Sequence, residues 1–102
     1  MKKLYTIRDV LTGYGVQNGV PAIIDLHNDQ EALRVVKGSC AAGATPNALN
    51  TNAEDKELWC VGEFDERTGE ITPCKPYLVA KAIEYMEVKK NGDLASESSK
   101  NA

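Results

Sequence analysis

The fold of this chain is constrained most by residues 57–64, ELWCVGEF, which are apolar on both sides when extended. Successive side chains of a β-strand point to opposite faces, here Leu58, Cys60 and Phe64 on one face and Trp59 and Val61 on the other. A strand with two apolar faces is typical of the centre of a sheet or of an interface. We therefore expect this segment either between two other strands or against a partner.

Two hairpins are predicted. Residues 65–69, DERTG, have the length and the late glycine of a longer hairpin connection, so a return strand is expected directly after them. Nearer the N-terminus, residues 4–10 and 20–26 read as strands. Between them, Asn18-Gly19 tolerates the positive φ that a tight hairpin turn demands.

Two segments have the signals of helices. The first begins at Asn28, a good N-cap, with Glu31 three residues later in a capping box, and ends at Gly38. The second begins near Pro76, which suits the first turn of a helix. Its apolar stripe consists of Leu78, Val79, Ala82, Ile83 and Met86.

The remaining segments set the domain boundaries. Residues 39–56 have no hydrophobic period and are expected to form a mobile loop. Residues 91–102 are polar, which predicts a disordered tail. Residues 1–90 then form a single α+β domain in ββαββα order. We expect a small antiparallel sheet of two hairpins, with two helices packed on one face.

Composition limits the classes of function. The 102 residues suffice for one small domain, whose modest core a homodimer would supplement. Three cysteines without C-x-x-C spacing and one histidine make no zinc constellation, so no metal or cofactor is expected. The simplest interpretation is a reduced, cytosolic protein. The chain shows no signal-peptide core and no apolar run near the roughly 18 residues of a membrane span.

The sequence gives little support for an enzyme. No nucleophile and base stand together, and the single His27 has no partner at motif spacing. The carboxylates Asp65, Glu66 and Glu70 read as a solvated hairpin tip rather than as an acid–base pair. We therefore expect binding rather than catalysis, and we assign no catalytic residues.

Aromatic and basic residues form the candidate binding set. Single-stranded DNA binders combine a positive groove with aromatic side chains on which bases stack. The residues that fit this pattern are Lys2, Lys3, Tyr5, Arg8, Tyr14 and Lys75. The 12 Lys and Arg against 15 Asp and Glu give a net charge of −3, which weighs against phosphate binding unless a local patch exists.

The order of several segments resembles a known viral family. The segments are YTIRD, EALRVV, AEDKELWCVGEFDERTGEI and a proline-led closing segment, of which GEFD followed by Thr68-Gly69 is the most specific. Together they resemble the small nonstructural protein of gokushoviruses, single-stranded DNA bacteriophages of the Microviridae, which is equated with the microvirus C protein. The resemblance covers residues 4–86.

The resemblance implies a non-virion phage protein in the cytoplasm of the bacterial host. The implied role is to shift genome synthesis toward single strands coupled to packaging. This entails contact with viral single-stranded DNA, the replication initiator or the procapsid. The resemblance brings no active site.

Two hypotheses of different class follow. The first is an accessory protein of phage replication and packaging that binds single-stranded DNA, with lysines and Arg8 on phosphates and Tyr5 or Tyr14 on bases. It requires a basic face in the structure, and lysines interleaved with carboxylates would argue against it. The second is a protein–protein adaptor that does not bind DNA and works through the Trp59 and Val61 face or a strand edge.

Overall fold

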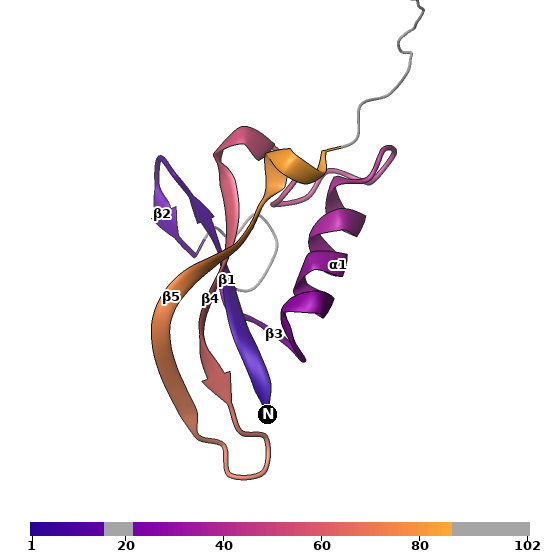
Figure 1. Cartoon of the computed structure of the whole chain (residues 1–102). Coiled ribbons are helices and arrows are strands. Elements are labelled where there is room, and N and C mark those ends of the chain that lie inside the picture. The colour runs from indigo at the N-terminus through magenta and orange to yellow at the C-terminus, as the bar shows by residue number, and fades with distance from the viewer. Residues whose placement is uncertain (16–21, 87–102) are drawn as a thin grey trace, which may run out of the picture.

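The computed structural model describes residues 1–15 and 22–86, which form one curled antiparallel sheet and a single α-helix (Figure 1). The strands are β1 (Lys2–Asp9), β2 (Gly13–Tyr14), β3 (Ile24–Leu26), β4 (Lys56–Phe64) and β5 (Ile71–Lys81). The helix is α1 (Asp29–Cys40), and the 3₁₀ helices are η1 (Ala53–Asp55) and η2 (Ala82–Tyr85). The sheet order is β2-β1-β4-β5, and β3 pairs with the N-terminal half of β1.

Strand β4 lies at the centre of the sheet, as its two apolar faces predict. It pairs with β1 on one side and with β5 on the other. The β4–β5 hairpin is also confirmed, and its loop is closed by the Gly69 N–H, which donates to the Asp65 carbonyl at 2.7 Å. Gly69 has φ +79°, a conformation that favours glycine. The register of the two strands shifts twice, and such irregularities bend a strand and increase its twist.

The predicted arrangement of two helices on a two-hairpin sheet is wrong. Residues 77–81 continue β5, where Leu78 lies opposite Trp59 and Ala80 opposite Leu58. After β5, the described residues contain only the short helix η2. Without β5, the outer edge of β4 would present unpaired N–H and C=O groups. Strand pairing therefore outweighs the helical spacing of the same apolar side chains, and the protein is mostly strands.

The prediction of an N-terminal hairpin is correct in part. Strands β1 and β3 pair antiparallel, with Lys3 opposite Leu26 and Tyr5 opposite Ile24. The short strand β2 intervenes, because the chain turns after Asp9 and pairs back on the end of β1. The Asn18-Gly19 turn lies outside the described residues.

Helix α1 begins where the capping pattern predicts. The Asn28 Oδ1 accepts from the N–H of Glu31 at 2.9 Å. The Glu31 carboxylate accepts from the N–H of His27 at 2.7 Å, one residue before the N-cap, rather than from the N-cap itself. The helix continues past Gly38 and ends at Cys40.

The boundaries of the predicted loop 39–56 are wrong, because this segment begins in α1, contains η1 and ends in β4. Two side-chain amides organise its middle. Nδ2 of Asn47 and Nδ2 of Asn50 each donate to the carbonyls of Ser39 and Thr45, at 2.9–3.1 Å. These bonds supply partners to a carbonyl at the end of α1, where helix carbonyls lack them. Mobility of the segment in solution stays a prediction, and the predicted tail 91–102 lies outside the described residues.

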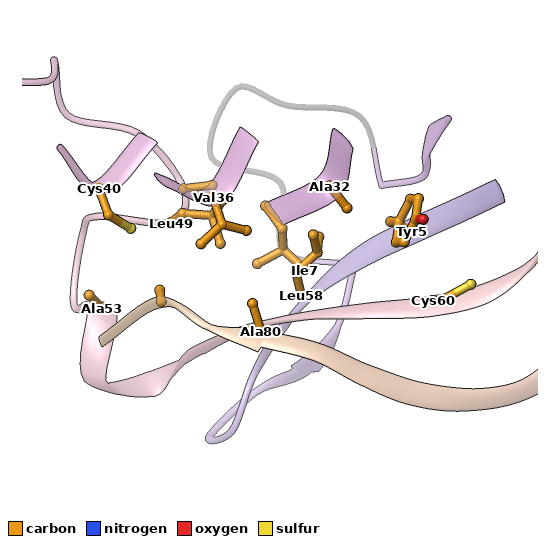
Figure 2. Close-up of a cluster of buried hydrophobic side chains, with 12 residues drawn as sticks. Tyr5, Ile7, Ala32, Val36, Cys40, Leu49, Ala53, Leu58, Cys60 and Ala80 are labelled. Atoms are coloured by element: carbon orange, nitrogen blue, oxygen red, sulfur yellow. The ribbon is translucent and has the colours of Figure 1, made fainter. Parts of the chain in front are cut away.

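One face of the sheet is covered by α1, and the hydrophobic core lies between them (Figure 2). The largest fully buried side chains are Tyr5, Val36, Cys40, Leu58 and Cys60. The opposite face carries no helix within residues 1–15 and 22–86 (Figure 1). We call it the open face. It presents Arg8, Tyr14, Glu57, Trp59 and Leu78, and Thr6 points the same way but is buried. In the described part of the chain, no helix has the length and apolarity to span a membrane.

Candidate functional site on the open face

Three neighbouring strands bring charged and aromatic side chains together on the open face. Ile7 points into the core, so alternation along β1 turns Arg8 to the open face. The register places Tyr14 of β2 on one side of Arg8 and Glu57 of β4 on the other. Trp59 follows two residues after Glu57 and therefore shares its face.

These four residues, Arg8, Tyr14, Glu57 and Trp59, form what we call the arginine–aromatic cluster. The guanidinium carbon of Arg8 lies 5.6 Å from the ring centre of Tyr14 and 5.8 Å from that of Trp59. The two rings meet edge to face at 5.9 Å and 83°. A cation near two aromatic faces is stabilised by their quadrupoles. The cluster is open to solvent, since Tyr14 is 54% exposed.

Glu57 fixes the orientation of the cluster. Its Oε1 accepts from Nη1 of Arg8 at 2.9 Å and from Nε1 of Trp59 at 2.8 Å. Burial raises the pKa of this carboxyl, but the hydrogen bonds from Trp59 and Arg8 outweigh it and hold the pKa below its ordinary value. Glu57 is therefore ionised at neutral pH and holds the arginine and the indole in one arrangement.

An apolar groove of about 340 Å³ adjoins the cluster on the open face. It is lined by Thr6, Tyr14, Gly15, Ala22, Ile23, Val61 and Pro76. The hydroxyl of Thr6 donates to the carbonyl of Ala22 at 2.8 Å, so this lining side chain already has its hydrogen-bond partner. Tyr14 belongs to both the groove and the cluster, which makes the two features continuous.

The predicted basic patch does not form as a unit. Nζ of Lys2 pairs with Asp25 at 3.2 Å, and Nζ of Lys3 lies 3.6 Å from Asp29 on the helix side of the sheet. Lys75 is exposed on β5. Of the predicted binding residues, the structure brings together Arg8 and Tyr14. It adds Trp59, which the sequence placed in a protein interface with Val61.

Tyr5 lies on the helix side of the sheet, as Lys3 does and opposite to Arg8 and Tyr14, and it is 0% exposed, so its ring is not available for stacking on a base. Its hydroxyl donates to Oδ1 of Asp29 at 2.6 Å, and the Tyr77 hydroxyl donates to Oδ2 of Asp29 at 2.9 Å. Burial raises the pKa of Asp29, but the hydrogen bonds from Tyr5 and Tyr77 and the charge of Lys3 outweigh it and lower the pKa. Tyr5 therefore joins β1 to the start of α1.

Tyr5→Phe is expected to lower the free energy of unfolding at pH 7 by about 1–2 kcal/mol, because Asp29 loses a hydrogen bond from a buried donor. The Asp29 carboxylate is 39% exposed, so solvent screening limits the effect. A carboxyl with a lowered pKa stabilises the fold above its ordinary pKa of about 3.9, and this stabilisation is lost as the pH falls through the folded value. Urea unfolding across pH 2–7 should thus show the difference between the two proteins shrinking below about pH 3.9. A difference that is constant across this range would contradict the role given to Asp29.

Part of the arginine–aromatic cluster could have been predicted from the alternation of residues within the strands. Glu57 and Trp59 are two residues apart in a strand and must share a face. The same alternation separates Tyr5 from Arg8. The pairing of Arg8 with Glu57 spans 49 residues, and no local pattern shows it.

The comparisons with known proteins identify the family. No curated protein and no solved structure gives a significant match to this chain. A family model described as "Phage ORF5 protein" matches residues 2–85, a range that runs from the first residue of β1 to the last residue of η2. The match includes every element that carries the open face and the helix behind it. The chain therefore belongs to the Phage ORF5 protein family, a family of bacteriophage proteins.

Proposed function

We propose that this protein is a non-virion accessory protein of gokushovirus DNA replication and packaging, and that it binds single-stranded DNA on the open face. The observation that carries this proposal is the arginine–aromatic cluster, in which Arg8 lies near the rings of both Tyr14 and Trp59. The resemblance to the gokushovirus nonstructural protein supports the biological setting, which is the cytoplasm of the bacterial host. The proposed activity is binding alone and uses no catalytic residue, metal or cofactor.

The cluster suits an unpaired base. Base–aromatic stacking contributes about 1–3 kcal/mol per base and depends little on sequence, since every base has a π-face. The exposed ring of Tyr14 provides such a surface. Glu57 holds Arg8 and Trp59 in place before any ligand arrives. A preorganised site loses less side-chain entropy on binding.

The charge distribution favours stacking over phosphate binding. On the open face, the charged strand residues placed by alternation and register are Lys2, Arg8 and Lys81 against Asp25 and Glu57. This face is therefore not acidic, although the whole chain has a net charge of −3. Lys2 and Arg8 are paired with carboxylates, so the basic face required for lysine-led phosphate binding does not form, and this argues against that mode. The support for single-stranded DNA binding is therefore base stacking, with few phosphate contacts.

The test measures binding to labelled single-stranded DNA by fluorescence anisotropy at a series of salt concentrations. Each neutralised phosphate contributes a slope of about −0.7 to the logarithm of affinity against the logarithm of salt concentration. With one or two phosphate contacts, we expect a slope between about −0.7 and −1.4. A slope steeper than about −3 would mean a phosphate-led mode and would contradict the site.

Tyr14 offers a matched pair of variants. Tyr14→Leu removes the ring and should raise the Kd about 5- to 150-fold, the equivalent of about 1–3 kcal/mol for one stacked base. Tyr14→Phe keeps the ring and should bind like the wild type. Since Tyr14 is 54% exposed, neither change should unfold the protein. Equal affinity of the leucine variant and the wild type would remove Tyr14 from the site.

A second function, a protein–protein adaptor, is favoured by one observation. The groove beside the cluster is apolar, and Val61 in its wall and Trp59 next to it are the residues assigned from the sequence to a protein interface. Absence of DNA binding even at low salt would favour this adaptor. Its partners, the replication initiator, the procapsid or a second copy of the chain, would then be tested with purified proteins.

A further inference from the structure

The groove next to the arginine–aromatic cluster is the part of the open face that the stacking proposal does not use. Its walls come from β1, from the start and end of the β2–β3 connection, and from the facing parts of β4 and β5. Its surface is mostly apolar, and its lining includes Ala22, Ile23, Val61 and Pro76. A ligand group in this groove therefore meets carbon atoms.

The lining contains few groups that recognise bases by hydrogen bonding. Sequence readout requires donors and acceptors directed at base edges. The Thr6 hydroxyl is committed to the carbonyl of Ala22, and Thr6 is 3% exposed. The Nε1 of Trp59, in the adjoining cluster, is committed to Glu57. The groove can therefore distinguish bases mainly by their apolar surface.

Thymine is the base whose edge carries an apolar group. Its C5-methyl is the base atom that proteins contact with apolar side chains. The Tyr14 ring forms one wall of the groove and also belongs to the cluster. A base stacked on this ring would therefore place its edge, or that of its neighbour, next to the apolar walls.

We propose that the groove accepts the C5-methyl group of a thymine, and that the protein therefore prefers thymine-rich single strands. This inference rests on the proposed single-stranded DNA binding. Burial of one methyl or methylene group contributes about 0.8 kcal/mol, which corresponds to about fourfold in affinity.

The experiment compares labelled oligo(dT) with oligo(dU) of about 12 nucleotides, a length within the site sizes of such binders. The two differ in the C5-methyl groups, so the comparison isolates them. We expect oligo(dT) to bind the wild-type protein at least about fourfold more tightly. Anisotropy titrations at the same low salt concentration give the ratio of the two Kd values.

Val61→Thr tests whether the preference comes from the groove. Threonine has nearly the shape of valine and adds a hydroxyl to the groove wall. The variant should lose the preference because it binds oligo(dT) more weakly, and a circular dichroism spectrum like that of the wild type would show that it is folded. The matched control is Val35→Thr, the same change at a valine on α1 that is 37% exposed and lies outside the groove. It should keep the preference.

The outcomes separate the two proposals. Equal binding of oligo(dT) and oligo(dU) by the wild type would overturn the thymine inference and leave the single-stranded DNA proposal standing. A preference that persists in Val61→Thr would move the methyl contact out of the groove and overturn the inference as well. Failure to bind either strand would overturn both proposals. It would favour an apolar side chain of a protein partner as the occupant of the groove.

Discussion

Lys56→Met is expected to lower the free energy of unfolding by about 3–5 kcal/mol, the cost of removing one partner from a buried ion pair. Lys56 is 3% exposed, which is rare for lysine. Its Nζ donates to the carbonyl of Thr51 at 2.7 Å and lies 3.7 Å from Oδ2 of Asp9. Methionine fills the space of the aliphatic stem but leaves this carbonyl and the Asp9 carboxylate without the ammonium.

Guanidinium chloride unfolding would measure this loss, with an unchanged m-value as the sign that both proteins unfold by the same transition. The matched control is Lys37→Met, at an exposed lysine of α1, for which a change within about 0.5 kcal/mol is expected. The double variant Asp9→Asn with Lys56→Met should recover part of the loss, because the unpaired charge is then absent. A loss below about 1 kcal/mol for Lys56→Met would mean that water replaces the ammonium at no great cost.

The local signals in the sequence predicted the elements whose causes are local. Asn28 begins α1 because its side chain satisfies a free N–H of the first turn, and a capping pattern of three residues contains this information. The central position of β4 followed from apolar residues on both of its faces. Neither conclusion needed a contact between distant parts of the chain.

The second helix could not be excluded from its own residues. Leu78, Val79 and Ala82 have the spacing of a helix stripe, and Leu78 and Val79 serve a strand equally well once β4 needs a partner. The choice between the two states depends on the unpaired edge of β4, which is a property of the sheet. The periodicity of residues 76–86 carries no information about this edge.

The candidate site shows the same division. Alternation within β1 separates Arg8 from Tyr5, so sequence alone could have removed Tyr5 from the binding set. The partners of the cations were not predictable, because Lys2 and Asp25 are 23 residues apart and Arg8 and Glu57 are 49 apart. Because of these distant pairings, Lys2 and Arg8 on the open face are each paired with a carboxylate.

Gly62→Ala is expected to destabilise the protein by about 1–3 kcal/mol, as overpacking does in a rigid environment. A Cβ at this position would lie 2.8 Å from the carbonyl oxygen of Thr72 and 3.3 Å from the Cα of Pro73. Both are backbone atoms of β5, so no side chain can swing aside and the strand itself must move. The measurement is again denaturant unfolding.

The control for Gly62→Ala is Gly38→Ala, for which the expected change in the free energy of unfolding has the opposite sign. A Cβ on Gly38 in α1 would meet no atom within 4 Å, so Gly38→Ala should stabilise the helix by about 0.5–1 kcal/mol. Equal effects at the two positions would show that the close approach of β5 does not matter.

Gly62 belongs to the GEFD segment that carries the family resemblance. The contact with β5 gives a structural reason for glycine there, so this part of the segment reflects strand packing, and the binding chemistry is sought in Arg8, Tyr14 and Trp59.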